Sequence, residues 1–310
     1  MGYFVEEVLT IEPSKRIGAT HYAICNGGKI RYLIALNSTC ARKRLSKNIS
    51  AYSNKLNILM KMLCVLPYSI LSRAKLGMYV QVSAADQVKN IINEMGCSSW
   101  NVIIGSYVEK QKVVFQCFSD EKVSEPALYI KVGGGAAEQE MKTETEYLRN
   151  PIQSNLFYSP KVLRSQARAE GYPFNIQVTE EFFGSKMNPE LNQDIYQIFR
   201  DIANSKPPIF DDGIEKVFSH GDFTPWNIRK DDKQYVVFDW EYSGYRFYGF
   251  DIIHYLWQIE NKLNKCSEEI AFIRAYQMVA KMDNQIAKMS QEDLKNQYFC
   301  ELEKHFGKVH

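Results

Sequence analysis

The spacing of hydrophobic and polar positions predicts a mixed α+β structure over the first hundred residues. Residues 20–37 alternate loosely around a Gly-Gly pair, a pattern that is typical of a β-hairpin. Residues 84–96 place apolar side chains at helical spacing and end in Gly96, which predicts an amphipathic helix with a glycine C-cap. Residues 52–75 have the composition of a helix that is interrupted near Pro67.

The pattern changes at Trp100 and predicts a small sheet with one helix. Residues 100–118 resemble two strands around a polar turn, and 128–132 form a third apolar run that contains a lysine. A glutamate-rich helix is expected over 136–150. Two further strands are predicted at 159–164 and 174–183. From residue 184 onward the chain is expected to be mostly helical, apart from residues 217–242.

These changes in pattern predict three parts. They are an N-terminal extension over 1–99, a sheet-rich part over 100–183 and a helical part over 184–310. Charge supports a division near residue 100, because residues 1–100 hold 13 Lys and Arg against 5 Asp and Glu, whereas the rest has a net charge of −6. The role of the basic extension stays open.

Composition narrows the class of protein. The chain has 310 residues, of which 45% are hydrophobic and 24% charged, as in an ordinary folded protein. A formal net charge of only +2 argues against a dedicated nucleic-acid binder. The seven cysteines show no CxxC pair, so we expect buried thiols in a reducing cytoplasm and neither disulfides nor a zinc site.

The most apolar stretch, residues 56–71, is too short to span a bilayer and contains Lys61 and Pro67. We expect a core helix there. Contact of residues 56–75 with a membrane surface is the alternative, because basic side chains flank the stretch.

Two short motifs contain the residues with catalytic potential. His220, Gly221 and Asp222 are followed by Asn227, and Asp239 comes directly after the apolar strand VVF. An aspartate in a tight loop, an amide and a second aspartate fit phosphoryl transfer. One carboxylate accepts the proton of a substrate hydroxyl, while the other carboxylate and the amide oxygen are hard ligands for Mg²⁺.

The segments HGDFTPWN (220–227) and FDWEYSGYRFYGFD (238–251) resemble the aminoglycoside phosphotransferase and choline kinase group. They are especially similar to bacterial choline-kinase-like proteins and to kinases of surface-polysaccharide gene clusters. The resemblance covers roughly 100–260. It implies an α+β, two-lobed, protein-kinase-like fold with residues 1–99 as an N-terminal α+β extension, and ATP bound with Mg²⁺ between the lobes.

The resemblance also assigns site residues. Asp222 matches the catalytic base, and Asn227 and Asp239 match the metal ligands. His220 matches a position that braces the catalytic loop, and Glu241 matches an acidic position near the metal or substrate.

Lys131 matches the strand lysine that touches the nucleotide phosphates. Glu144 best fits the helix glutamate that pairs with it, and Glu140 is the alternative. Gly105 and Ser106 stand where the family has its nucleotide-covering loop, although that loop is usually richer in small residues.

The acceptor and the oligomeric state stay open. Complete kinase motifs favour an ATP-dependent kinase of a small hydroxyl compound, such as a choline-like amino alcohol or a sugar. An aminoglycoside kinase and a catalytically silent nucleotide-binding protein are the alternatives. Aromatic residues around the second motif would suit a quaternary-ammonium cage or, more simply, a packed core. His254, three residues after Asp251, is expected to be a hydrogen-bonded core histidine.

Overall fold

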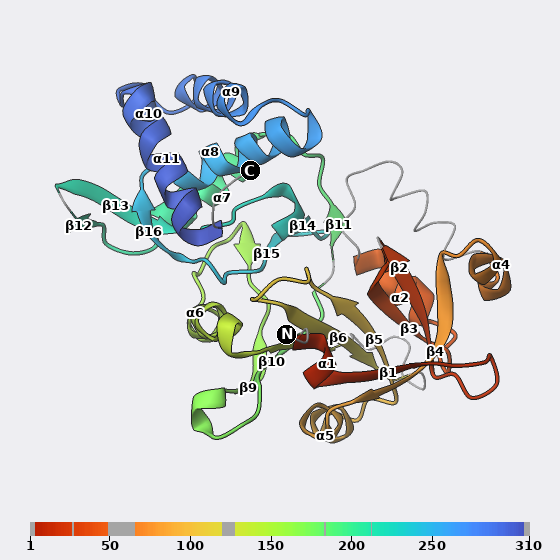
Figure 1. The fold of residues 1–310 in the computed structure, drawn as a ribbon. Coiled ribbons are helices and arrows are strands. Elements are labelled where there is room, and N and C mark those ends of the chain that lie inside the picture. The colour runs from red at the N-terminus through yellow and green to blue at the C-terminus, as the bar shows by residue number, and fades with distance from the viewer. Residues whose placement is uncertain are drawn as a thin grey trace. The chain divides into compact units, whose positions relative to one another are not determined.

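The computed structural model describes residues 4–26, 28–48, 66–119, 128–182, 184–211 and 213–306, and it has the α+β fold predicted from the sequence (Figure 1). The chain divides into two compact units. Unit 1 consists of Met1–Thr145 and Lys161–Phe182, and unit 2 of Glu146–Pro160 and Phe183–His310. Each unit is described separately below.

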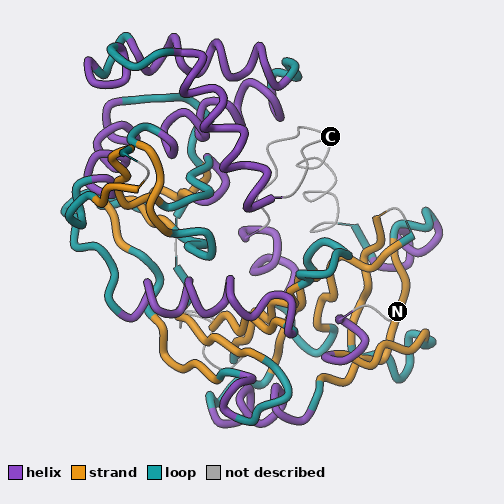
Figure 2. Tube along the Cα trace, turned by 60° about the vertical axis from the view of Figure 1, so that its left-hand side comes forward, coloured by secondary structure: helices purple, strands orange, loops and turns teal. Residues whose placement is uncertain are grey.

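Unit 1 is built on a nine-stranded sheet whose neighbouring strands are all antiparallel. Its strands are orange in Figure 2. In spatial order they are β1 (Leu9–Pro13), β4 (Gly77–Ala84), β2 (His21–Asn26), β3 (Lys29–Ala35), β5 (Ser99–Ile104), β6 (Lys112–Phe118), β7 (Leu128–Gly133), β10 (Asn175–Glu180) and β9 (Val162–Gln166). The helices of this unit are α1 (Phe4–Val8), α2 (Ala41–Asn48), α4 (Tyr68–Arg73), α5 (Asp86–Glu94), η1 (Gly135–Ala137), η2 (Arg168–Glu170) and the first part of α6 (Glu138–Arg149).

The sheet is continuous across the sequence position at which the basic extension was expected to end. Strand β3 pairs with β5 through Tyr32 opposite Ile103 and Leu33 opposite Val102. Leu33 and Val102 are fully buried in the same hydrophobic core. The first 99 residues therefore contribute strands and core side chains to the sheet of unit 1. The three-part domain bounds stay a prediction.

Helix α5 ends as its sequence predicts. It buries Val88, Ile91 and Ile92 on one face, and Gly96 follows it with φ +68°, a left-handed conformation that glycine adopts at low cost. Strand β4 was missed, although Val80 and Val82 alternate with polar residues and are buried.

The apolar stretch is only partly described. Residues 56–65 lie outside the described residues, so the expected core helix and the alternative of membrane contact both remain predictions there. After Pro67, α4 is a short helix that buries Leu71. Among helices within the described ranges, none combines the length and apolar character needed to cross a bilayer.

The thiols partly follow the expectation. Cys25, Cys40, Cys97, Cys117, Cys266 and Cys300 are all free. Cys117 is buried in the core, and burial raises its pKa well above the ordinary value. Cys25, Cys40, Cys97 and Cys266 are only half-buried, and Cys300 is exposed, so the expectation of buried thiols was wrong for Cys300.

Unit 2 combines helices with two small sheets. One sheet has the order β11 (Ser185–Lys186), β14 (Ile228–Lys230), β15 (Tyr235–Val237), β8 (Phe157–Tyr158), and the other has the order β12 (Ile209–Asp211), β13 (Ile214–Ser219), β16 (Gly244–Phe247). The helices are α7 (Gln193–Ala203), η3 (Pro225–Asn227), α8 (Phe250–Gln258), η4 (Ile259–Leu263), α9 (Glu268–Ala280), α10 (Asn284–Ala287) and α11 (Gln291–Phe306). The expectation of a mostly helical segment missed β11, and it also missed β12 and β16, which flank β13.

Candidate functional site

The His-Gly-Asp loop (residues 219–223) begins where β13 ends, and its shape depends on Gly221. The φ angle of Gly221 is +88°, in the left-handed region that side chains with a Cβ rarely adopt. A Cβ at this position would lie 2.1 Å from the backbone oxygen of Tyr242. Glycine is therefore required here for two independent steric reasons.

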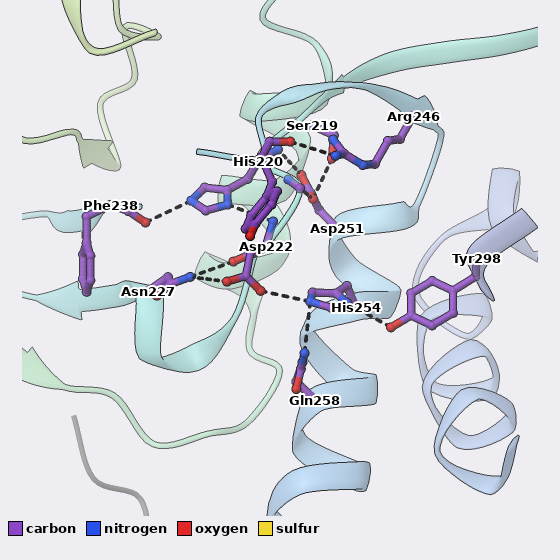
Figure 3. A network of polar contacts seen from close by, with 12 residues as sticks. Ser219, His220, Asp222, Asn227, Phe238, Arg246, Asp251, His254, Gln258 and Tyr298 are labelled. Carbon is purple, nitrogen blue, oxygen red and sulfur yellow. Dashed lines mark hydrogen bonds and ion pairs between the residues drawn. The ribbon is translucent and has the colours of Figure 1, made fainter. Parts of the chain in front are cut away.

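Asp251, in the first turn of α8, contacts the loop through its carboxylate (Figure 3). Its carboxylate accepts hydrogen bonds from the Ser219 hydroxyl at 2.7 Å, from the His220 backbone N–H at 2.7 Å and from the Gly221 backbone N–H at 3.0 Å. Because Asp251 is only 2% exposed, these three donors compensate for the burial of its charge. The loop is thus fixed to α8 through its backbone.

His220 links the loop to the end of β15. Its Nδ1 accepts the backbone N–H of Asp222 at 3.2 Å, so Nε2 bears the ring hydrogen and donates it to the Phe238 carbonyl at 3.1 Å. The ring is fully buried, and burial lowers its pKa, which keeps it neutral. These contacts suit a bracing residue better than a proton carrier.

The carboxylate of Asp222 is held at both oxygens (Figure 3). The Asn227 amide nitrogen donates to Oδ2 at 2.9 Å and also to the Asp222 backbone oxygen at 3.0 Å. On the other side, His254 Nε2 lies 3.1 Å from Oδ1. The side chain of Asp222 is 19% exposed, so the carboxylate is oriented by the protein and still accessible to solvent.

The second motif presents its acidic residues directly after β15. Asp239 has φ +69°, a strained conformation for a residue other than glycine, and such strain is concentrated at functional sites. A carboxylate oxygen of Asp239 and one of Glu241 lie within 4.8 Å of each other. The Asn227 amide uses its nitrogen for Asp222, so its oxygen is the atom left for a cation. These oxygen ligands fit Mg²⁺.

The predicted phosphate lysine lies in unit 1. On β7, the Lys131 ammonium lies 2.7 Å from the carboxylate of Glu144, which is on α6 and only 3% exposed. The alternative partner, Glu140, contacts Lys112 at 2.5 Å and Lys110 at 2.8 Å instead. Burial alone would raise the pKa of Glu140, but hydrogen bonds from the two lysines outweigh it and lower this pKa. Glu144 is thus the helix glutamate that contacts Lys131.

Gly105 and Ser106 lie in the loop between β5 and β6. The N–H of Gly105 donates to the Lys112 carbonyl at 2.9 Å, and a Cβ on Gly105 would lie 2.8 Å from the same oxygen. Close approach of the two hairpin strands therefore explains the glycine without any phosphate. Ser106 is exposed in the same loop.

Several aromatic residues of the second motif belong to the core. Trp240 is fully buried, stacks on Tyr147 with ring centroids 3.8 Å apart, and donates its indole N–H to the Val237 carbonyl. Phe247 and Trp257 are 3% and 2% exposed. These rings pack the interior of unit 2 and are not arranged as an open cage.

The sequence reasoning underestimated His254. As expected, it is buried and hydrogen-bonded, but one of its partners is the carboxylate of Asp222. A signal was available, because His254 lies about one helical turn after Asp251 on α8. Asp251 fixes the loop backbone, so the residue one turn later on the same face of α8, His254, lies beside Asp222.

Comparisons with known proteins support the resemblance that the motifs suggested. Residues 157–283 match the family described as "Phosphotransferase enzyme family". No curated protein sequence matches the chain significantly.

Three solved structures are distantly similar to this chain. An amicoumacin kinase in complex with AMP-PNP, Ca²⁺ and amicoumacin has 11% identity, covers 63% of this chain and 78% of its own, and has a TM-score of 0.37. A spectinomycin phosphotransferase in complex with ADP and spectinomycin has 11% identity, covers 61% of this chain and 79% of its own, and has a TM-score of 0.40. Choline kinase from Cryptosporidium parvum has 12% identity, covers 55% of this chain and 69% of its own, and has a TM-score of 0.38.

The family match runs continuously from β8 to α9, so it contains the His-Gly-Asp loop, Asn227, Asp239 and His254. Over residues 157–283, the chain is therefore similar to the phosphotransferase enzyme family.

Proposed function

We propose that this protein is a small-molecule kinase that transfers the γ-phosphoryl group of ATP to a hydroxyl of a small acceptor. The observation that supports this most strongly is the carboxylate of Asp222, oriented from both sides by Asn227 and His254 and still 19% exposed. A general base needs this combination of fixed geometry and access.

In the proposed reaction, Asp222 accepts the proton of the acceptor hydroxyl. The hydroxyl oxygen forms a bond to the γ-phosphorus, the bond from that phosphorus to the β–γ bridging oxygen breaks, and ADP leaves. The products are the phosphate ester of the acceptor, ADP and a proton. Catalysis then depends chiefly on positioning and on neutralising phosphate charge.

Asn227 and Asp239 would hold Mg²⁺ through their side-chain oxygens, with Glu241 close to Asp239. Bound Mg²⁺ would neutralise charge on the phosphates. Lys131 would contact the α- and β-phosphates, and the buried carboxylate of Glu144 would fix the position of its ammonium. Gly105 and Ser106 would cover the nucleotide through the β5–β6 loop.

The acceptor is proposed by class only. A choline-like amino alcohol or a sugar is our first candidate, in keeping with the motif resemblance. The burial of Trp240, Phe247 and Trp257 gives no support to an aromatic cage made of these rings. An aminoglycoside acceptor and a catalytically silent nucleotide-binding protein are the alternatives that an assay must separate.

The test is release of ADP from Mg-ATP in the presence of choline, ethanolamine, simple sugars or aminoglycosides. One acceptor should raise ADP release well above background in the wild-type protein, and Asp222→Ala should abolish the increase while still binding ATP. Equal stimulation in Asp222→Ala would remove Asp222 from the role of base. Binding of ATP without release of ADP for any acceptor would favour the catalytically silent nucleotide-binding protein, and a failure to bind nucleotide at all would contradict the proposed function.

A further inference from the structure

We propose that His254, held by Tyr298, is a positioning residue that orients the carboxylate of Asp222 for phosphoryl transfer. The inference rests on the proposed function, because it assigns a role in that same site. It connects two elements far apart in the sequence, α8 and the C-terminal helix α11, with the loop that contains the proposed base (Figure 3).

The ring of His254 has almost no freedom to move. It is fully buried and stacks between Phe250, at 5.7 Å and 8° between ring planes, and Trp257, at 6.1 Å and 16°. Close-packed interiors fix side chains in single rotamers. The Nε2 atom therefore points at Oδ1 of Asp222 in a direction that the core of unit 2 determines.

The proton positions follow from the partners. An ionised carboxylate only accepts hydrogen bonds, so Nε2 of His254 must bear the hydrogen that faces Asp222. In the neutral ring, Nδ1 is then an acceptor, and the Tyr298 hydroxyl at 2.9 Å donates to it. Burial raises the pKa of Tyr298 well above its usual value, so the phenol keeps the hydrogen that it donates.

Gln258 is compatible with this arrangement. The atom of its amide that lies 3.2 Å from Nε2 of His254 is assigned as the nitrogen. Rotation of an amide by 180° exchanges its oxygen and nitrogen, so the oxygen of Gln258 can share the hydrogen on Nε2. Asp222 and the oxygen of Gln258 then share that hydrogen, and both contacts favour the tautomer in which Nε2 bears it.

His254 affects catalysis because it restricts rotation of the Asp222 carboxylate. Rotation about the last torsion of an aspartate is soft, so a carboxylate held at one oxygen only can turn away from a substrate hydroxyl. Asn227 holds Oδ2 and His254 holds Oδ1, and together they fix the plane of the Asp222 carboxylate. Loss of His254 should therefore slow the chemical step and leave nucleotide binding intact.

The first experiment needs no turnover. In the full-length protein labelled with ¹⁵N at histidine, the side-chain NMR spectrum of His254 should show hydrogen on Nε2. Tyr298→Phe and Asp222→Asn should each shift the His254 resonances. A neutral His254 ring with its hydrogen on Nδ1, or resonances that neither variant moves, would overturn the proposal even if the protein proves to be an active kinase.

The second experiment measures turnover with Mg-ATP and the acceptor found by the ADP-release panel. His254→Leu should lower kcat about 10- to 100-fold, the range typical of losing a group that orients a reacting or metal-bound side chain. The dissociation constant of Mg-ATP should stay within about twofold of the wild-type value. His254→Gln, which keeps a neutral N–H near the same place, should recover much of the lost kcat. The kcat of Tyr298→Phe should lie between the values of His254→Leu and the wild-type protein.

The matched control is Tyr248→Phe, which removes another buried tyrosine hydroxyl of unit 2, bonded to Asp283 at 2.8 Å. It should lower thermal stability about as much as Tyr298→Phe but leave kcat unchanged. If His254→Leu retains the wild-type kcat, or if Tyr248→Phe loses as much activity as Tyr298→Phe, the role of His254 is only structural. An inactive wild-type protein would contradict the proposed function instead, and the NMR result would then decide the contact by itself.

Discussion

Replacement of Gly221 by alanine tests the geometry of the His-Gly-Asp loop. The new Cβ would meet the backbone oxygen of Tyr242 at 2.1 Å, and a backbone oxygen cannot rotate away as a side chain can. To reach an ordinary contact distance the loop must move by about 1 Å, a displacement that can cost about 100-fold in rate when it affects reacting groups. Asp222 follows Gly221 directly, so it moves with the loop.

The cost in stability has three sources. The left-handed conformation at φ +88° costs a residue with a Cβ about 1–2 kcal/mol. Overpacking against Tyr242 adds about 1–3 kcal/mol. Weakening of the bond from the Gly221 N–H to the buried carboxylate of Asp251, now 3.0 Å long, adds up to about 2 kcal/mol. Together these contributions should lower the free energy of unfolding of Gly221→Ala by about 2–7 kcal/mol.

Gly213→Ala is the matched control in the same unit. Gly213 also has a positive φ, +76°, but a Cβ there would meet nothing within 4 Å. Only the conformational cost remains, so the loss should be about 1–2 kcal/mol. Urea unfolding followed by tryptophan fluorescence measures both variants. If Gly221→Ala loses no more stability than Gly213→Ala, the steric reasoning about the loop is refuted.

Three further predictions follow from the site and the core. Lys131→Met should raise KM for ATP at least about tenfold, because it removes the ion pair to buried Glu144 and, with it, the phosphate contact that we propose for Lys131. An unchanged KM in steady-state assays would contradict this. Asp239→Ala should weaken the dependence of ATP binding on Mg²⁺, which calorimetry with and without the cation would detect; an undiminished Mg²⁺ dependence would contradict the role of Asp239 as a ligand. Burial lowers the pKa of His21 from 6.5 to about 4, so the unfolded chain binds a proton before the folded one does. Stability should then fall by about 3 kcal/mol between pH 6.5 and 4 in urea unfolding, and His21→Gln should flatten that slope; equal slopes would refute it.

The motif residues could be predicted because their geometry is mostly local. His220, Asp222 and Asn227 lie within eight positions of one another, and their mutual hydrogen bonds span at most five residues. Asp239 follows a short apolar strand that ends where the site begins. In such a case spacing along the chain almost determines spacing in the structure.

Contacts between distant elements could not be predicted in the same way. The bond between His254 and Asp222 joins residues 32 positions apart, and the bond between His254 and Tyr298 joins residues 44 positions apart. Both depend on how α8 and α11 pack, and helix periodicity alone does not specify which helices meet.

The continuity of the sheet of unit 1 could not be predicted from the sequence either. The composition and charge of residues 1–99 differ from those of the following segment, which favoured a separate extension. Pairing of β3 with β5 nevertheless makes one continuous sheet, because strands that bury the same apolar face can join irrespective of the charge of their exposed side chains.

The most direct test of the central claim is to follow the phosphate itself. The wild-type protein is incubated with Mg²⁺ and ATP labelled with ³²P at the γ position, together with the acceptor that stimulates ADP release. We predict that the label appears in a phosphate ester of the acceptor and that Asp222→Ala forms no such ester. Label that appears only as inorganic phosphate, or ester formed equally fast by Asp222→Ala, would contradict the account.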